Sequence, residues 1–268
     1  MIKTNFHTHT VYCDGKDTPE ALVEAALAKS FSALGFSGHS YFEQDMPYVM
    51  SPDRERKYIK QIGRLKQSYA GKLQIFCGIE QDLYSPPSAF VYDYVIGSVH
   101  FVHKDGAYLI VDGSLEEIKE ILSRYYADNF DAFAKDYFAS VALIPQKTNA
   151  DIIGHFDLIL KHMDQLPYTP TEAFFQYAKE AVLKLIPYHK PFEINTGAMA
   201  RGYRTTPYPH KTILKMIFES GGSILISSDC HNKDDLDYGF DVARTLAREA
   251  GFTQQAIITE TGLSYIPL

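Results

Sequence analysis

Short apolar or β-branched runs alternate with longer amphipathic stretches along almost the whole chain. This alternation predicts seven short strands separated by helices. The predicted strands are Ile2–Phe6, Ala33–Ser37, Leu73–Ile79, Tyr94–Val99, Ile152–Gly154, Pro191–Ile194 and Ser223–Ser227. The predicted helices are Pro19–Ser30, Asp53–Tyr69, Leu115–Tyr126, Asp131–Leu143, Thr171–Leu185, Lys211–Glu219 and Leu236–Ala250.

Local signals support several of these elements. Thr18 precedes a proline and a glutamate, which is the pattern of an N-cap followed by proline at the first helical position. Ser114 and Glu117 have the spacing of a capping box. The segment Phe101–Val111 interrupts the rhythm and predicts a hairpin that turns at Lys104–Asp105–Gly106.

Strands that alternate with helices predict a parallel sheet with right-handed crossovers. About seven such units in 268 residues favour an α/β barrel over an open sheet. The chain has no repeat, low-complexity tract or linker, so we expect residues 1–268 to form a single domain.

Composition narrows the class of protein. Hydrophobic residues make up 46% of the chain and charged residues 22%, which excludes disordered, collagen-like and coiled-coil proteins. The net charge of −7 provides no basic surface for nucleic acid. The three cysteines are too few for a disulfide framework, and no signal peptide or membrane-length apolar run is present. We therefore expect a cytoplasmic protein with no membrane partner.

Histidines and acidic residues gather where the predicted strands end. His7 and His9 end the first strand, two residues apart, and therefore point to the same side. Asp229 and His231 repeat this spacing after the last strand. The carboxyl ends of barrel strands form one rim, where α/β barrels carry their active sites. The nine candidate metal ligands at this rim are His7, His9, Asp14, His39, Glu80, His100, His155, Asp229 and His231.

Each of these residues has a purely structural interpretation when it is taken alone. A single strand-end histidine is more often a hydrogen-bonded structural residue than a ligand. Unrelated structural residues, however, need not fall at the same end of successive strands, so the set as a whole favours a metal site. His103, His162, His189 and His210 do not follow the pattern, and we expect them to be surface or packing residues.

Six histidines and three carboxylates suit zinc, iron or manganese, and nine ligands imply two or three divalent ions. Such ions carry more charge than three carboxylates neutralise, which favours a bridging hydroxide and an anionic substrate such as a phosphate. Arg201 and Arg204 follow the sixth strand, where either could bind a phosphate with two hydrogen bonds. Arg204 could equally pair with a surface acid.

These residues resemble the PHP (polymerase and histidinol phosphatase) family. The motifs are His7-Thr-His9-Thr, Cys-Asp14-Gly, Gly-His39, Gly-Ile-Glu80, Gly-Ser-Val-His100, Ile-Gly-His155 and Ser-Asp229-Cys-His231. They extend over nearly the whole chain. The resemblance implies a distorted, TIM-like (β/α)7 barrel of the PHP fold with a trinuclear metal centre at the carboxyl ends of the strands. The chain departs from the family at Gly38, where members often have Asp, and at Cys230, where they commonly have Ala.

The resemblance also implies how the ligands are shared. One metal would take His7, His9, Glu80 and Asp229, and a second would share Glu80 and add His100 and His155. The third would take Asp14, His39 and His231. Arg201 matches the position expected to touch phosphate, and Asp229 and His231 are the candidates for general acid.

Within the family, the chain is similar to the stand-alone L-histidinol-phosphate phosphatases of histidine biosynthesis. We therefore expect hydrolysis of L-histidinol phosphate by attack of a metal-bridging hydroxide. In the loop Tyr41–Tyr48, the aromatic and acidic residues are candidates to stack on or pair with the imidazole of the substrate, namely Tyr41, Phe42, Glu43 and Asp45. The loop Phe101–Tyr108 is a second candidate for substrate selection.

Three alternative functions fit the sequence less well. Another small phosphate or a nucleic acid could be the substrate, although the acidic chain has no appended nucleic-acid module. An amidohydrolase-type barrel also begins with His-x-His, but it usually recruits a bridging lysine where this chain has Glu80 and His100. A non-catalytic metal-stabilised domain would be marked by lost ligands, and all nine are present. The sequence leaves open whether the protein is a homo-oligomer.

Overall fold

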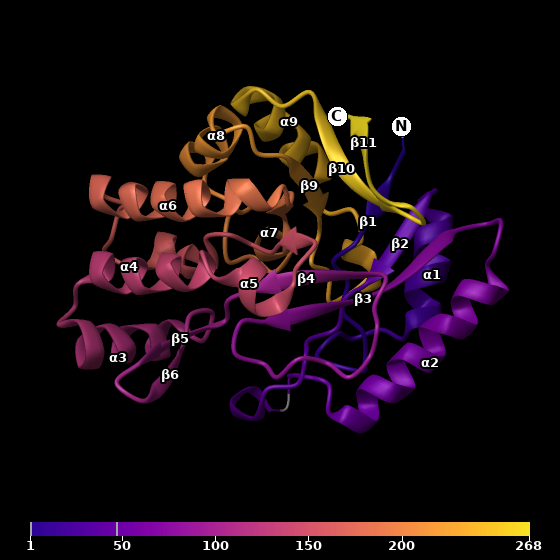
Figure 1. Ribbon diagram of the computed structural model, residues 1–268, viewed down its shortest axis with the longest axis horizontal. Helices are drawn as coiled ribbons and strands as arrows, with labels where there is room; N and C mark the ends of the chain where they lie inside the picture. Colours follow the sequence, from indigo (N-terminus) through magenta and orange to yellow (C-terminus); the bar gives the residue numbers. More distant parts are fainter. Residues whose placement is uncertain (1, 47) are drawn as a thin grey trace.

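The computed structural model describes residues 2–46 and 48–268. At its centre, a parallel seven-stranded sheet curls into a nearly closed barrel (Figure 1). The barrel strands lie in the order β1-β2-β3-β4-β7-β8-β9, and every adjacent pair is parallel. They are β1 (Thr4–Asn5), β2 (Ala33–Phe36), β3 (Gln74–Asp82), β4 (Tyr94–Ser98), β7 (Ile152–Ile153), β8 (Phe192–Asn195) and β9 (Ile224–Ser227). The predicted α/β barrel is thus confirmed.

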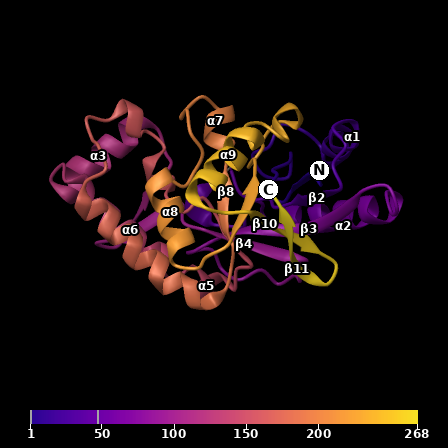
Figure 2. The ribbon, with the colours of Figure 1, turned by 90° about the horizontal axis from the view of Figure 1, so that it is seen from above.

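Helices surround the strands, and the view from above shows them around the central sheet (Figure 2). They are α1 (Pro19–Ala28), α2 (Pro52–Ser68), α3 (Leu115–Tyr126), α4 (Phe130–Val141), α5 (Ile144–Thr148), α6 (Glu172–Leu185), α7 (Gly197–Ala200), α8 (Lys211–Glu219) and α9 (Phe240–Ala250). Thr18 caps α1 by accepting from the backbone N–H of Ala21, and Ser114 and Glu117 form the predicted capping box of α3. No helix in the described part of the chain is long and apolar enough to cross a membrane.

Two hairpins lie outside the barrel sheet (Figure 1). The first, β5 (Phe101–Lys104) with β6 (Ala107–Ile110), was predicted. The second, β10 (Gln254–Thr259) with β11 (Gly262–Pro267), was not. Ala256 and Ile258 of β10 pack into the apolar cluster that fills the barrel, and the side chain of Gln255 accepts the backbone N–H of Ile226 in β9. The C-terminal hairpin therefore covers the barrel beside β9.

Tyr94 shows how the barrel interior is filled. Its hydroxyl donates to the backbone carbonyls of Phe6 and Phe36. A Cβ at Gly35 or at Gly78 would lie 2.4 Å from atoms of the Tyr94 side chain, so both strands need glycine for this ring to fit. The interior below the rim is therefore solid, and polar side chains can gather only at the carboxyl end.

The ends of some predicted elements are corrected. Strand β3 continues three residues beyond the predicted end at Ile79. Its pairing with β4 continues there, with Glu80 opposite Ile96 and Asp82 opposite Ser98. Glu80 therefore lies inside the strand and not at its end. Helix α9 begins at Phe240 instead of Leu236, because Gly239 before it adopts a left-handed conformation (φ 71°).

Candidate metal centre

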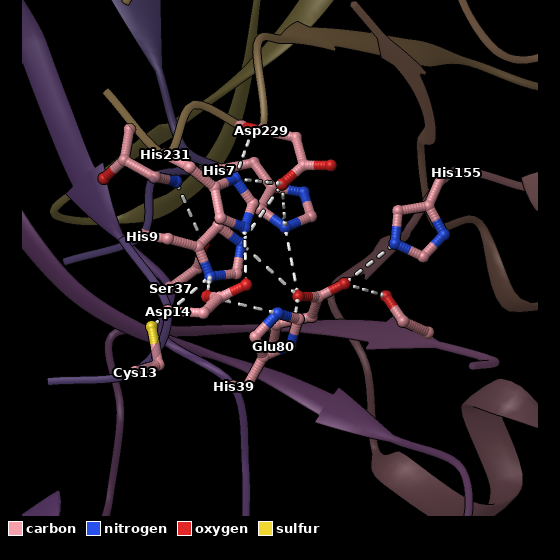
Figure 3. Close-up of polar contacts among 12 residues, drawn as sticks. His7, His9, Cys13, Asp14, Ser37, His39, Glu80, His155, Asp229 and His231 are labelled. Atoms are coloured by element: carbon pink, nitrogen blue, oxygen red, sulfur yellow. Dashed lines mark hydrogen bonds and ion pairs between the residues drawn. The ribbon is translucent and has the colours of Figure 1, made fainter. Parts of the chain in front are cut away.

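The structure brings the nine predicted ligands together at the carboxyl ends of the barrel strands. Figure 3 labels each of them except His100. Three overlapping groups have candidate ligand atoms within 4.8 Å of one another. The groups are His9, Asp14, His39 and His231; His7, His9 and Asp229; and His39, Glu80 and His100. His155 joins them through its Nε2, which lies 2.9 Å from Glu80 Oε1. Six of the seven barrel strands contribute a ligand, directly or through the loop that follows.

Several buried atoms of this cluster have no hydrogen-bond partner among the described residues. They are His7 Nε2, His9 Nε2, Asp14 Oδ1, Glu80 Oε2 and His155 Nδ1. His9 Nε2 lies 3.1 Å from Asp229 Oδ1 and 3.5 Å from Glu80 Oε2, without the alignment of a hydrogen bond. Burying such atoms unpaired costs free energy. The side chains therefore fit divalent cations, and their nitrogen and oxygen donors suit zinc, iron or manganese.

Two further acidic residues orient the candidate ligands, although neither was predicted as a site residue. Glu193 in β8 is fully buried, lies 2.6 Å from His7 Nδ1 and accepts the backbone N–H of His155 at 2.7 Å. Asp82 accepts the backbone N–H of His100 at 2.9 Å and lies 3.2 Å from its Nδ1. A carboxylate behind a metal-binding histidine fixes the ring so that the other nitrogen faces the metal. A charged residue inside a buried strand was the signal that could have revealed Glu193.

The charges of the cluster favour cation binding. Burial raises the pKa values of Glu80 and Asp229, but surrounding histidines, and Arg201 in the case of Asp229, outweigh burial and hold both pKa values well below the usual range. Burial and the neighbouring His231 and His39 lower the pKa of His9 to about 3. The carboxylates are therefore ionised and His9 is neutral, which are the forms that bind a metal. Burial lowers the pKa of His39, but Glu80 and Asp14 outweigh burial and raise this pKa to about 9, so a metal bound there would displace a proton from this ring.

Close backbone contacts and one left-handed residue hold the loops that carry the candidate ligands. Asp229 has a left-handed conformation (φ 46°), which is rare for a residue with a side chain and marks strain held by its surroundings. The next residue, Cys230, bridges to Thr8 and joins the last strand to the first. A Cβ at Gly15 would lie 2.4 Å from backbone atoms of His9 and Thr10, so the turn that carries Asp14 requires glycine.

A cavity of about 720 Å³ opens in front of the cluster. Arg201 lies at its edge: its guanidinium donates to Asp229 Oδ2 at 3.2 Å and lies 2.8 Å from His231 Nδ1. The other walls come from Asp45, Tyr48 and Tyr203 and from residues of the segments 110–117 and 158–165. The lining includes four acidic residues, namely Asp45, Asp112, Glu116 and Glu117.

Four predicted substrate contacts do not line this cavity. Arg204 is buried and donates to the backbone carbonyls of Leu160 (2.8 Å) and Thr206 (3.3 Å), so its guanidinium holds loops together instead of facing the cluster. Phe42 packs against Phe101 and Tyr108, with ring centroids 5.1 Å apart in both cases. Half-buried Tyr41 and exposed Glu43 also lie outside the lining, whereas Asp45 and Tyr48 of the same loop belong to it.

One histidine expected to be a surface or packing residue lines the cavity. His162 is buried, and its Nε2 lies 2.8 Å from the carbonyl oxygen of Gly113. The other three agree with the expectation. His103 is exposed beside Tyr108, His189 is exposed, and His210 caps α8 by accepting the backbone N–H of Thr212.

Comparisons with known proteins agree with the fold. The chain is 27% identical over 258 residues to a protein named probable histidinol-phosphatase from Deinococcus radiodurans, covering 91% of this chain and 92% of that one. It is 24% identical to the histidinol-phosphatase of Bacillus subtilis, covering 90% and 98%. A crystal structure of histidinol phosphate phosphatase from Lactococcus lactis, complexed with zinc, L-histidinol and phosphate, has a TM-score of 0.72 at 21% identity and covers 98% of each chain.

The model of one protein family also matches this sequence. It is the model of the PHP domain, and the match extends over residues 5–197, which hold seven of the nine predicted ligands. This match covers well over half of the chain, and the resemblance seen in the motifs is confirmed: the chain belongs to the PHP domain family.

Proposed function

We propose that this chain is a metal-dependent phosphatase that converts L-histidinol phosphate and water to L-histidinol and phosphate. The observation that carries the proposal is the buried cluster of nine nitrogen and oxygen donors that opens, beside Arg201, onto one cavity. The names of the relatives from Deinococcus and Bacillus, and the ligands of the Lactococcus structure, support this choice of substrate.

The nine residues would hold two or three divalent ions in the shared arrangement that the family resemblance implies. Glu80 has the position for sharing, because its two oxygens face different histidines: Oε1 lies 2.9 Å from His155 Nε2 and Oε2 lies 2.9 Å from His39 Nδ1. Zinc, iron and manganese all suit these donors. Such ions, when bound, act as Lewis acids and lower the pKa of water that they coordinate.

Arg201 is the candidate phosphate contact. Its planar guanidinium can offer a phosphate two parallel hydrogen bonds, and its contacts with Asp229 and His231 would hold it beside the reacting phosphorus. The same contacts bear on the two residues named as candidates for general acid. The pKa of Asp229 is held well below its usual range against the effect of burial, so Asp229 is ionised and has no proton to donate. His231 faces the guanidinium of Arg201 through Nδ1 and the candidate ligand Asp14 through Nε2, so both residues are better suited to hold a metal.

The acidic cavity walls complement the other end of the substrate. L-Histidinol phosphate carries an ammonium group and an imidazole at a short distance from its phosphate. Asp45 and Asp112 line the cavity, and neither carboxylate accepts a hydrogen bond from the described residues, since Lys161 donates to the backbone carbonyl of Asp112. We assign them to the ammonium end of the substrate, because a partly buried carboxylate binds a cation more strongly than an exposed one does.

We also infer that residues 1–268 form one domain, since the candidate ligands extend from His7 to His231 and the C-terminal hairpin packs into the barrel. A cytoplasmic location fits three cysteines that are all free.

The test is phosphate release from L-histidinol phosphate, compared with a nucleotide, an aryl phosphate and single-stranded DNA. Each reaction is run with manganese or zinc and again after chelation. We expect selective, chelator-sensitive turnover of L-histidinol phosphate, and near-complete loss in the His9→Ala and Asp229→Ala variants with the fold retained. Equal slow rates on all monoesters, or cleavage of DNA, would refute the substrate. Near-normal activity of either variant would refute the metal centre.

A further inference from the structure

A thiol stands behind one of the candidate ligands. Cys13, in the turn that follows β1, is buried, and its Sγ lies 3.4 Å from His9 Nδ1 and 3.5 Å from the carbonyl oxygen of Thr10. Figure 3 shows the sulfur in contact with the His9 ring at the edge of the cluster. None of the proposed steps uses this thiol.

The hydrogen-bond partner of His9 Nδ1 differs in kind from those of the neighbouring histidines. It is the sulfur of Cys13, because the nearest carboxylate oxygen, Asp14 Oδ1, lies 3.5 Å away without the alignment of a hydrogen bond. Nδ1 of His7 faces the carboxylate of Glu193, and Nδ1 of His100 faces the carboxylate of Asp82. Both partners can only accept a hydrogen bond. A thiol can accept one and donate another, although each bond is weak.

Gly38 provides the room for this arrangement. A Cβ at position 38 would lie 3.3 Å from Cys13 Sγ and 3.1 Å from the sulfur of Met50. Sulfur-bearing side chains thus occupy the space beside position 38. The missing side chain of Gly38 and the sulfur contact of His9 are therefore parts of the same local packing.

The direction of the hydrogen bonds follows from the position of His9. Its Nε2 faces Asp229 and Glu80, has no hydrogen-bond partner among the described residues and must be unprotonated to bind a cation. The ring proton then lies on Nδ1, which points at Cys13 Sγ. The thiol accepts this proton and can turn its own hydrogen toward the carbonyl of Thr10.

We propose that Cys13 is a positioning residue that accepts the Nδ1–H of His9 and thereby fixes the imidazole with Nε2 toward Glu80 and Asp229. The proposal rests on the metal centre of the proposed function. Cys13 does not line the cavity, and it acts only through the orientation and tautomer of His9.

The matched pair Cys13→Ser and Cys13→Ala tests this role. Both variants lose the volume of the sulfur, but only serine keeps an atom that can accept from Nδ1. We expect the zinc affinity of Cys13→Ala to be about tenfold lower than that of the wild type, so a chromogenic chelator should remove its zinc at about a tenth of the chelator concentration. Cys13→Ser should keep most of the wild-type zinc affinity. Cys77→Ala, a half-buried thiol in β3 away from the cluster, serves as the control and should bind zinc as the wild type does.

Nitrogen–proton NMR of the zinc-loaded protein provides a readout independent of activity. The wild type and Cys13→Ser should show a slowly exchanging Nδ1–H signal that is absent from the His9→Gln spectrum, and Cys13→Ala should show faster exchange of this proton. Equal zinc affinity in the serine and alanine variants, or a wild-type His9 protonated at Nε2, would overturn the proposal. Wild-type protein that binds zinc but does not hydrolyse L-histidinol phosphate would instead refute the function and leave this role intact.

Discussion

At the scale of single residues, Asp229 links the cluster to the cavity. Its carboxylate approaches His7 and His9 on one side and Arg201 on the other, and its backbone has a left-handed conformation. A Cβ at Gly197, the first residue of α7, would lie 3.0 Å from both Asp229 and Arg201. Glycine therefore permits the close approach that brings the guanidinium to the ligands.

Arg201→Gln should lower kcat/KM for L-histidinol phosphate by about a hundredfold, because a donor aimed at the developing charge is lost. The kcat/KM of Arg201→Lys should lie between those of the wild type and Arg201→Gln, because lysine keeps the charge but cannot offer two parallel hydrogen bonds. Steady-state phosphate release measures both, with the exposed Arg248→Lys of α9 as control. Activity of Arg201→Gln within twofold of the wild type would remove Arg201 from the site.

At the scale of elements, the cavity wall opposite the cluster is built by a loop that other segments hold in place. The loop leads from β6 into α3. Lys161 donates to the carbonyl of Asp112, His162 lies against the carbonyl of Gly113, and the capping box of Ser114 begins α3. The wall is therefore set by packing between segments far apart in the sequence, which makes it suited to select a substrate.

Asp45→Asn should raise KM for L-histidinol phosphate about tenfold, because the loss of one charge-assisted contact with the ammonium costs about 1.4 kcal/mol. KM for an aryl phosphate, which has no ammonium, should not change. The exposed neighbour Glu43→Gln, which does not line the cavity, is the matched control. An equal rise of KM for both substrates would contradict the assignment to the ammonium.

The same carboxylate predicts a pH dependence. Burial raises the pKa of Asp45 to about 6, so in the wild type this carboxylate takes up a proton and loses its negative charge as the pH falls through that value. The ratio of KM between Asp45→Asn and wild type should therefore be largest above pH 6 and should approach one at lower pH. A ratio independent of pH between 5 and 8 would show that the charge of Asp45 does not contribute.

At the scale of the whole molecule, the cluster connects the first and last strands of the barrel. The two strands meet where His9 donates its backbone N–H to the carbonyl of Cys230 at 2.9 Å. His7 and His9 lie on one side of this junction, and Asp229 and His231 on the other. Ions held between them would close the barrel in addition to serving the reaction.

Removal of metal should therefore lower the melting temperature by about 5–10 °C, as expected when ions at well above their dissociation constants leave a domain of this size. Differential scanning calorimetry of chelated and zinc-loaded protein measures the shift. Glu80→Gln should show a smaller shift, because one of the shared charges is missing. Identical melting curves with and without zinc would mean that the cluster binds no metal.

The barrel and the candidate ligands could both be predicted from the amino-acid sequence. Strand and helix periodicities are local properties, and the caps at Thr18 and Ser114 depend on residues only three positions away. The pair His7 and His9 shares one side because side chains alternate along a strand. The remaining ligands could be expected beside them because parallel strands present all their carboxyl ends to one rim.

The surroundings of those ligands, in contrast, became known only from the folded arrangement of the chain. Arg204 turned out to hold Leu160, 44 positions away, and Glu193 to orient His7, 186 positions away. The cavity position of His162 and the sulfur of Cys13 beside His9 likewise depend on how separate loops pack. Contacts of this kind arise from the relative placement of whole elements and leave no periodic pattern. Even where a charged residue such as Glu193 stands out in an apolar strand, the sequence does not show which distant residue it contacts.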